Sequence, residues 1–318
     1  MRSSHVFTLP ARSRLLIPLG ALLMLPLAGA ASPLRAQRDS SFAVARNAVV
    51  DITVRTGRLV VRGGSASTGA IRGRSGDYQL RTSGVGVTLE ASDDMRSSSS
   101  SRSGSRRDDA TLELDLPRNV RLVISTASAD VDVSGIDGDV EIRTTSGDID
   151  LDDIGGRLTL ETLSGDIRSG GRSGPARVTT MSGDISLRGV RDDVNVHTTS
   201  GDVMLGMDRA ARVEVESISG SITFDGSTTD DARLQLTTHS GDVTLRLPES
   251  ARGSIDVSTF NGEMSSSGTG SLTLMPSSLT PSRNDRAVRR YEIGGGGSTR
   301  FTISTFNGDV RVVRGTRS

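Results

Sequence analysis

Acidic residues recur at a fixed interval along the middle of this 318-residue chain, and their carboxylates are the groups best placed to do chemistry. Most of them follow a Ser-Gly pair and precede Ile or Val. The series contains Asp130, Asp148, Asp166, Asp184 and Asp202, then Ser221 in place of an acid, then Asp242, Glu263 and Asp309. Carboxylates gathered on one edge could ligate Ca²⁺, which prefers several oxygen ligands, or serve as acid and base on a polysaccharide.

A turn role is the competing interpretation of the same series, and we expect it to hold. An Asp that follows a Gly can accept hydrogen bonds from nearby backbone amides and shape the turn. The nonapeptide pattern of calcium β-rolls is not met, because the residues between successive acids carry no matching Gly/Asp set. If a cation does bridge the series, we expect its ligands to be Asp148, Asp166, Asp184 and Asp202. No other cofactor is indicated.

These acids belong to a longer repeat. Ser-Gly-Asp followed by Ile or Val occurs at Ser146, Ser164, Ser182 and Ser200, in steps of 18 residues. Self-similarity at a short fixed period indicates one structural unit stacked on copies of itself. Taking the Ser as an anchor, equivalent positions along the chain are Ser128, Ser146, Ser164, Ser182, Ser200, Ser219, Ser240, Asn261 and Asn307.

Each unit holds two short strands around a Gly corner. Apolar residues lie six and four positions before the anchor, as in Leu158 and Leu160, with polar residues between them, and the alternation resumes after the Gly at Ile167. A period of two predicts strands with one buried face. Neither strand can bury that face alone, so the units must stack. The sequence therefore predicts an all-β, right-handed parallel β-helix or β-solenoid with coils of about 18–21 residues.

A hydroxyl row accompanies the acids, two positions before each anchor, where strand parity predicts side chains that point inward. Hydroxyls there can bond to neighbouring coils or to the turn backbone. The row contains Thr126, Thr144, Thr162, Thr180, Thr198, Ser217, Thr238, Thr259 and Thr305.

Other catalytic candidates are few. His197 and His239 are both predicted to point outward, and no Ser/His/Asp arrangement can be placed. The pairs Asp152-Asp153 and Asp192-Asp193 fall at the second turn of their coils, where a solvated loop is expected rather than a glycosidase pair. There are no cysteines, hence no disulfide, thiolate metal site or catalytic thiol.

The N-terminus has the form of a secretory signal peptide, predicted over residues 1–36. Arginines precede an apolar run, Leu15 to Ala31, that ends in small residues. An uncleaved anchor is the alternative, but the run is short and contains two prolines. The remainder, 37–318, is predicted to be one solenoid domain with a flexible Ser/Arg-rich insertion at 93–109 and a second insertion at 265–297. Residues 42–63 and 70–91 are expected to form two irregular first coils.

Charge and composition limit the classes of partner that the protein could bind. All 38 basic residues are Arg, and removal of residues 1–37 leaves 34 of them against 38 acids, so binding of DNA or RNA has no electrostatic basis. Aromatics are 3% and Trp is absent. We expect an exported protein of the periplasm, cell surface or medium, with no stable membrane span once the signal is removed.

The repeats also resemble a known family. The serial Thr-x-Ser-Gly-Asp-[Ile/Val] motif, the run Gly294–Gly297 before Phe301–Thr305, and the closing Asn307-Gly308-Asp309-Val310 are similar to the bacterial DUF4097 adhesin-like family. The similarity covers about residues 42–315, and the stretch 93–109 departs from it. The resemblance implies an exported β-solenoid and supplies no catalytic residues.

The sequence therefore favours a non-enzymatic envelope or secreted solenoid that binds a surface glycan or an envelope protein. Outward mixed charge, such as Arg143 beside Glu161, fits such a surface. Two alternatives stay open: a carbohydrate-active lyase or hydrolase that uses the stacked aspartates, and an envelope-stress sensing component, by analogy with the family. The open ends of a solenoid are sticky edges, so we expect capping by the terminal segments or self-association.

Overall fold

The computed structural model describes residues 34–35, 39–45, 47–65, 67–73, 78–83, 86–91, 111–268, 272–274 and 288–315. The chain divides into two compact units, Met1–Ala31 and Ser32–Ser318, and every described residue belongs to the second. The predicted insertion 93–109 and, apart from residues 34–35, the predicted signal segment 1–36 lie outside the described residues. Across the described ranges, no helix is long and apolar enough to cross a membrane.

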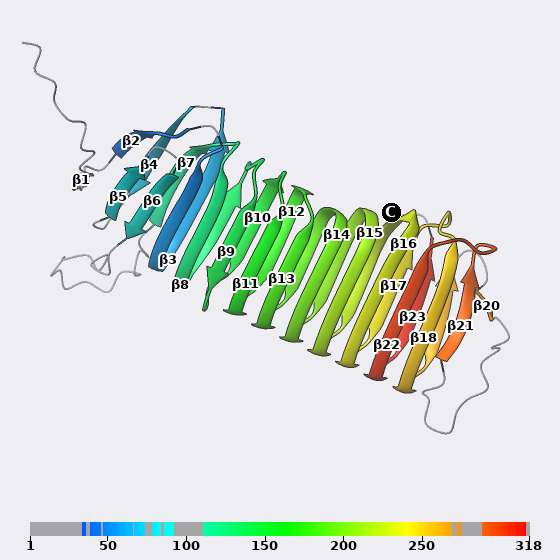
Figure 1. Cartoon of the computed structure of the whole chain (residues 1–318). Helices are drawn as coiled ribbons and strands as arrows, with labels where there is room; N and C mark the ends of the chain where they lie inside the picture. Colours follow the sequence, from blue (N-terminus) through cyan, green and yellow to red (C-terminus); the bar gives the residue numbers. More distant parts are fainter. Residues whose placement is uncertain are drawn as a thin grey trace, which may run out of the picture. The chain divides into compact units, whose positions relative to one another are not determined.

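Parallel strands stacked coil on coil form the body of the second unit (Figure 1). In each coil one strand precedes the Ser-Gly-Asp corner and a second strand follows it, and longer strands run on from one into the next. The strands of this part are β8 (Arg121–Ser134), β9 (Val140–Thr144), β10 (Ile149–Ile154), β11 (Leu158–Ser164), β12 (Ile167–Ser173), β13 (Ala176–Ser182), β14 (Ile185–Ser200), β15 (Val203–Ser219), β16 (Ile222–Ser240) and β17 (Val243–Leu247).

The register stacks like residues above one another. Leu158 of β11 pairs with Val140 on one side and Ala176 on the other, and Ile167 of β12 pairs with Ile149 and Ile185. All six of these apolar side chains on the strands are buried, as their alternation with polar residues predicted. The predicted all-β parallel solenoid is confirmed.

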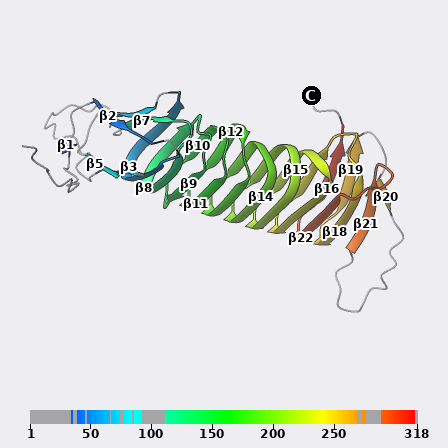
Figure 2. The same cartoon turned by 45° about the horizontal axis from the view of Figure 1, so that its top comes forward.

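The C-terminal end does not follow chain order. β22 (Arg300–Asn307) pairs with β16 on one side and β18 (Gly253–Asn261) on the other. Likewise β23 (Val310–Arg314) lies between β17 and β19 (Met264–Gly268). The last coil of the sequence is therefore inserted between two earlier ones, as the red strands between yellow and orange ones show (Figures 1 and 2).

The stretch 265–297, predicted as an insertion, makes this return possible and also covers the end. It contains β20 (Leu272–Leu274) and β21 (Val288–Ile293), and β21 pairs antiparallel with β18. β20 in turn pairs antiparallel with β21. The Asn307 coil therefore lies between the Ser240 coil and the Asn261 coil, although it comes last along the chain.

The N-terminal end is arranged in the same way. β3 (Val49–Gly64) makes a whole coil whose residues pair directly with β8, Val50 opposite Leu122 and Val61 opposite Val133. Its other edge is covered by β6 (Gly86–Ala91) and β7 (Thr111–Pro117), which run parallel to it. Antiparallel strands lie beyond these: β1 (Leu34–Arg35), β2 (Asp39–Ala43), β4 (Thr68–Gly73) and β5 (Tyr78–Ser83). The expected coil at 70–91 is thus an end cover and not a coil between β3 and β8.

Candidate functional site

The corners that carry the acids depend on glycine for two reasons. Gly165 has φ +122° and Gly183 has φ +117°, in the left-handed region that side chains disfavour. A Cβ on either would lie 2.2 Å from the carbonyl oxygen of the corner glycine one coil earlier. Only Gly allows coils to approach this closely, and the approach places each following Asp directly beside its neighbour.

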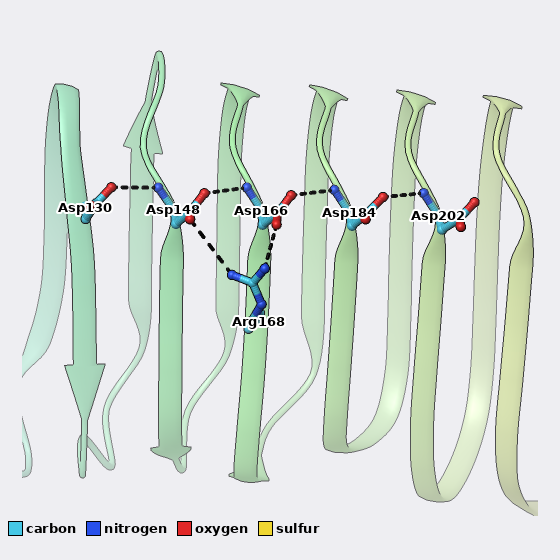
Figure 3. A network of polar contacts seen from close by, with 6 residues as sticks. All are labelled: Asp130, Asp148, Asp166, Arg168, Asp184 and Asp202. Atoms are coloured by element: carbon cyan, nitrogen blue, oxygen red, sulfur yellow. Dashed lines mark hydrogen bonds and ion pairs between the residues drawn. The ribbon is translucent and has the colours of Figure 1, made fainter.

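The acidic row is a chain of hydrogen bonds from coil to coil (Figure 3). The backbone N–H of each acid donates to Oδ1 of the acid one coil earlier: 3.1 Å from Asp148 to Asp130, 2.9 Å from Asp166 to Asp148, and 3.0 Å from Asp184 to Asp166. In the next two coils, the N–H of Asp202 donates to Asp184 and the N–H of Ser221 donates to Asp202. One oxygen of each of these carboxylates therefore holds the turn of the next coil, whereas the turn interpretation expected bonds to local amides.

The same series of hydrogen bonds links the inserted coil to its two neighbouring coils. The N–H of Asp309 donates to Asp242 at 2.8 Å, and the N–H of Glu263 donates to Asp309 at 2.9 Å. The spatial order of the row is thus Asp242, Asp309, Glu263, which differs from the order along the chain.

Arginines compensate the charge at one part of the row. The guanidinium of Arg168 lies 2.5 Å from Oδ2 of Asp166 and 3.9 Å from Oδ2 of Asp148. Arg58 occupies the place of the acid in the coil before Asp130, and its Nε lies 2.6 Å from Asp132. Within the described ranges, no group of three or more His, Asp or Glu side chains is arranged to hold a metal ion. Calcium binding by Asp148, Asp166, Asp184 and Asp202 stays a prediction.

The hydroxyl row lies inside the corner. Thr162, Thr180 and Thr198 each donate from Oγ1 to the carbonyl oxygen of the anchor serine two residues later, at 2.9–3.0 Å. These side chains are buried. Ser217 occupies the same position, but its buried hydroxyl has no partner among the described residues. The inward orientation that strand parity predicted is therefore observed.

A hollow of about 520 Å³ lies on the outward face of four stacked strand segments. They are the segments that follow the corners, in β8, β10, β12 and β14. Charged groups of both signs line it: Asp132, Asp150, Asp152, Arg168 and Arg188. Gly170, which pairs with Asp152, contributes no side chain and so leaves the space open.

Asp150 is the electrostatically perturbed group of this hollow. Partial burial raises its pKa, and the neighbouring carboxylates of Asp132 and Asp148 raise it further, against the opposing effect of Arg168. A carboxyl with a raised pKa beside a second carboxyl is the arrangement from which acid catalysis is built. Sequence reasoning missed this group, although the pattern Asp-x-Asp in two successive coils, Asp130–Asp132 and Asp148–Asp150, was available as a signal.

The other predicted candidates are dispersed. His197 lies with Nδ1 3.2 Å from Glu216, and His239 stacks on Phe306, so the two histidines have separate partners. The pair Asp152-Asp153 is divided: Asp152 lines the hollow, while Asp153, at φ +53°, bonds Arg118 at 2.8 Å. The predicted pairing of Arg143 with Glu161 is present at 3.1 Å.

Sequence reasoning also missed a row at the position just before each anchor, exposed throughout except at Phe306, which is half-buried. These residues point outward beside the corner, and several are large and apolar. In spatial order the row is Thr145, Leu163, Met181, Thr199, Ile218, His239, Phe306 and Phe260. The signal was present in the x of Thr-x-Ser-Gly-Asp, which a search for chemical groups passes over.

The chain is similar to a known protein family. The model of a family described as Toastrack DUF4097 matches residues 94–313. None of the curated proteins matches the chain.

Two solved structures are among the similar ones. A "putative cell adhesion protein" from Clostridium sporogenes is 11% identical with TM-score 0.28, over 89% of this chain and 100% of its own. A "putative adhesin" from Bacteroides fragilis is 13% identical with TM-score 0.38, over 86% of this chain and 95% of its own. Scores this low do not establish a shared fold, and nothing further follows from them.

Proposed function

The chain belongs to the Toastrack DUF4097 family, and from that premise we propose that it is an exported, non-enzymatic solenoid of the cell envelope. Its role is to present an adhesin-like surface to a glycan or protein partner. A stack of coils suits this role, because each added coil extends the same outward rows by about 4.8 Å and builds a long contact surface.

One observation carries the proposal: carboxylates of the acidic row accept hydrogen bonds from backbone N–H groups of the next coil. Because Oδ1 of Asp148, Asp166 and Asp184 accepts the amide of the next coil, these carboxylates have a structural task in every coil. The sequence alternative assigned the same carboxylates to acid–base chemistry. Their use as turn acceptors favours the binding role.

The test compares the mature chain, residues 37–318, with Asp166→Asn and Asp184→Asn. Asn keeps an oxygen that can accept the amide hydrogen bond but lacks the charge. We expect no release of reducing ends and no unsaturated products from a panel of bacterial surface polysaccharides with any of the three proteins. Turnover by the parent chain that disappears in both variants would replace the proposal with the enzyme.

A second candidate function, a carbohydrate-active enzyme, has support at the hollow around Asp150. There the carboxyl with the raised pKa lies on a strand paired in register with that of Asp132. A pair of carboxyl groups is the usual apparatus of glycoside hydrolysis. Turnover that is lost in Asp150→Asn but kept in Asp193→Asn, an exposed carboxylate outside the hollow, would establish this function. The absence of turnover in the parent chain would remove it.

Calcium is tested separately by thermal unfolding of residues 37–318 in millimolar Ca²⁺ and then in EDTA. A ligand that binds only the folded state raises the unfolding temperature by mass action. An upward shift that EDTA reverses and that Asp184→Asn diminishes would make the acidic row a calcium site. Equal unfolding temperatures would leave it as turn structure.

A further inference from the structure

The exposed row before the anchors, here called the corner ridge, concentrates apolar surface on one edge of the stack. It is the part of that row after Thr145, namely Leu163, Met181, Thr199, Ile218, His239, Phe306 and Phe260. Among the described residues seven large hydrophobic side chains are exposed, and four of them belong to this ridge: Leu163 at 48%, Met181 at 55%, Ile218 at 55% and Phe260 at 65%. Isolated exposed apolar residues are ordinary, but a contiguous set marks an interaction site.

The inserted coil makes the ridge continuous. Phe306 stacks between His239 and Phe260, with ring centroids 4.9 Å and 4.8 Å apart and the planes nearly parallel. In the sequence Phe260 and Phe306 are separated by an entire return of the chain. The three-ring end of the ridge therefore exists only because the last coil enters between two earlier ones.

Carboxylates border the ridge along the same corner. Three residues beyond the ridge position lies the acidic row, in which Ser221 replaces one acid, and Asp184, Asp202, Asp242, Asp309 and Glu263 are all exposed there. In the described part of the chain none of these five makes an ion pair. On the other side, two residues before the ridge, lie Glu161, which pairs with Arg143, and Glu216, which lies beside His197. The ridge is thus an apolar strip whose acidic side carries five carboxylates without an ion pair among the described residues.

We propose that the corner ridge binds a cationic, apolar polypeptide segment, one whose apolar side chains cover the ridge while Lys or Arg beside them meets the acids. This deepens the proposed function and rests on it, because it names the partner class of the binding surface. From Leu163 to Phe260 the ridge spans seven coils, about 29 Å at 4.8 Å per step. An amphipathic helix of about 20 residues has this length.

Charge and geometry select this occupant over others. An anionic membrane would bring negative charge against the acids, which costs free energy at close range. A second copy of this chain is close to neutral, with 34 Arg against 38 acids after residue 37, and so offers no excess of positive charge. Sugar rings stack on free aromatic faces, but both faces of Phe306 are covered by its neighbours. A partner that lies along the ridge crosses the strands, so it binds through side chains and not by adding a strand.

The experiment uses residues 37–318 and three synthetic helical peptides of about 20 residues: Leu/Lys amphipathic, Leu/Glu with the same apolar face, and Ser/Lys with the same charge. We expect the Leu/Lys peptide to bind at least tenfold more tightly than the other two, with affinity falling as salt rises. The triple variant Met181→Ser, Ile218→Ser, Phe260→Ser should weaken that binding at least tenfold. Met204→Ser, an exposed Met on the outward face of β15 and outside the ridge, should not change it.

Several outcomes would overturn the proposal. They are equal binding of the Leu/Lys and Leu/Glu peptides, equal binding of the Leu/Lys and Ser/Lys peptides, full binding by the triple variant, or an equal loss in Met204→Ser. Unfolding temperatures confirm that the exposed substitutions leave the fold intact. Tighter association with anionic vesicles than with the Leu/Lys peptide would assign the ridge to membranes instead.

Failure of the ridge can be distinguished from failure of the proposed function. A chain that binds a surface polysaccharide but none of the peptides keeps its binding role and loses the ridge assignment. A chain that degrades polysaccharide loses the non-enzymatic role, whatever the peptides do.

Discussion

In the central coils, neighbours along the chain are neighbours in space, whereas at both ends they are not. From β9 to β15 each strand pairs with the equivalent strand one coil before and one coil after. At the ends, β3 and the pair β22–β23 lie one place inside the stack, with other strands outside them.

The difference teaches how a repeat protein closes its ends. An outermost coil exposes both a row of unpaired backbone groups and its apolar face. Here the strands with the regular pattern, such as Phe301–Ile303, gain parallel neighbours on both sides. Antiparallel strands that do not repeat, β21 at one end and β4 and β5 at the other, lie further out. The ends are therefore capped, but not by the terminal segments as expected at the C-terminal end: there the cap is β21, from inside the chain, and the last strands, β22 and β23, lie within the stack. Self-association stays a prediction.

The largest effect is expected from removing the inserted coil in a chain that ends at Gly297. Phe301, Ile303, Val310 and Val312 are almost fully buried, and losing them costs on the order of 10 kcal/mol. We expect hydrogen exchange of residues 253–268 to become fast while residues 203–219 stay protected. A peptide of residues 298–315 added in trans should restore protection. A chain that begins at Asn47 is the control, since among the described strands β1 pairs with β5 and β2 with β4, far along the chain from the inserted coil.

A corner glycine is the next most sensitive point. Gly165→Ala should lower the free energy of unfolding by roughly 2–4 kcal/mol, because φ is unfavourable and the Cβ meets a carbonyl oxygen at 2.2 Å. In the inserted coil, a Cβ on Gly308 would lie 2.0 Å from the carbonyl oxygen of Gly241. Gly308→Ala should therefore lower the free energy of unfolding by the same amount if that coil is packed equally well. Gly170→Ala, 3.4 Å from its nearest neighbour atom, is the control. Urea denaturation measures all three, and equal values for Gly165→Ala and Gly170→Ala would contradict the prediction.

Hydroxyls of the inner row allow a finer comparison of the same two regions. Thr180→Val in a central coil and Thr305→Val in the inserted coil each remove one hydrogen bond to a carbonyl oxygen. Each should cost about 1 kcal/mol in denaturation experiments. Ser217→Ala should cost close to nothing, because that hydroxyl has no partner in the described part of the structure. A much smaller cost for Thr305 than for Thr180 would mean that the inserted coil is more loosely held.

The smallest effect concerns pH and Asp150. Burial and neighbouring carboxylates raise its pKa in the folded state, so the folded chain holds this proton more tightly than the unfolded chain. Its contribution to stability is therefore full below the ordinary Asp pKa and is lost as pH rises through the raised value. Asp150→Asn should be more stable than the parent chain at neutral pH, and the advantage should vanish in acid. Asp193→Asn, followed by the same thermal scans, should show no such pH-dependent gain.

Much of the candidate site was predictable because it repeats. The acidic row, the inward threonines and their place at a Gly corner follow from one motif read with a period of two, and hydrogen bonds such as Thr180 to Ser182 lie within a single coil. The hollow around Asp150 was not predictable. It depends on Gly170 being paired with Asp152 one coil earlier and on the reach of Arg168, and these are relations between coils.

The amino-acid sequence by itself determined that the chain is an all-β stack, which residues of each coil point inward, and where the corners lie. Those features depend on backbone geometry and on alternation within a few residues. Only the tertiary structure decided the order of the coils at the ends, and with it the ring stack of His239, Phe306 and Phe260. The physical reason is degeneracy: all these strands carry the same alternating pattern, so each could pair with several others. The choice among them depends on which arrangement covers both open ends.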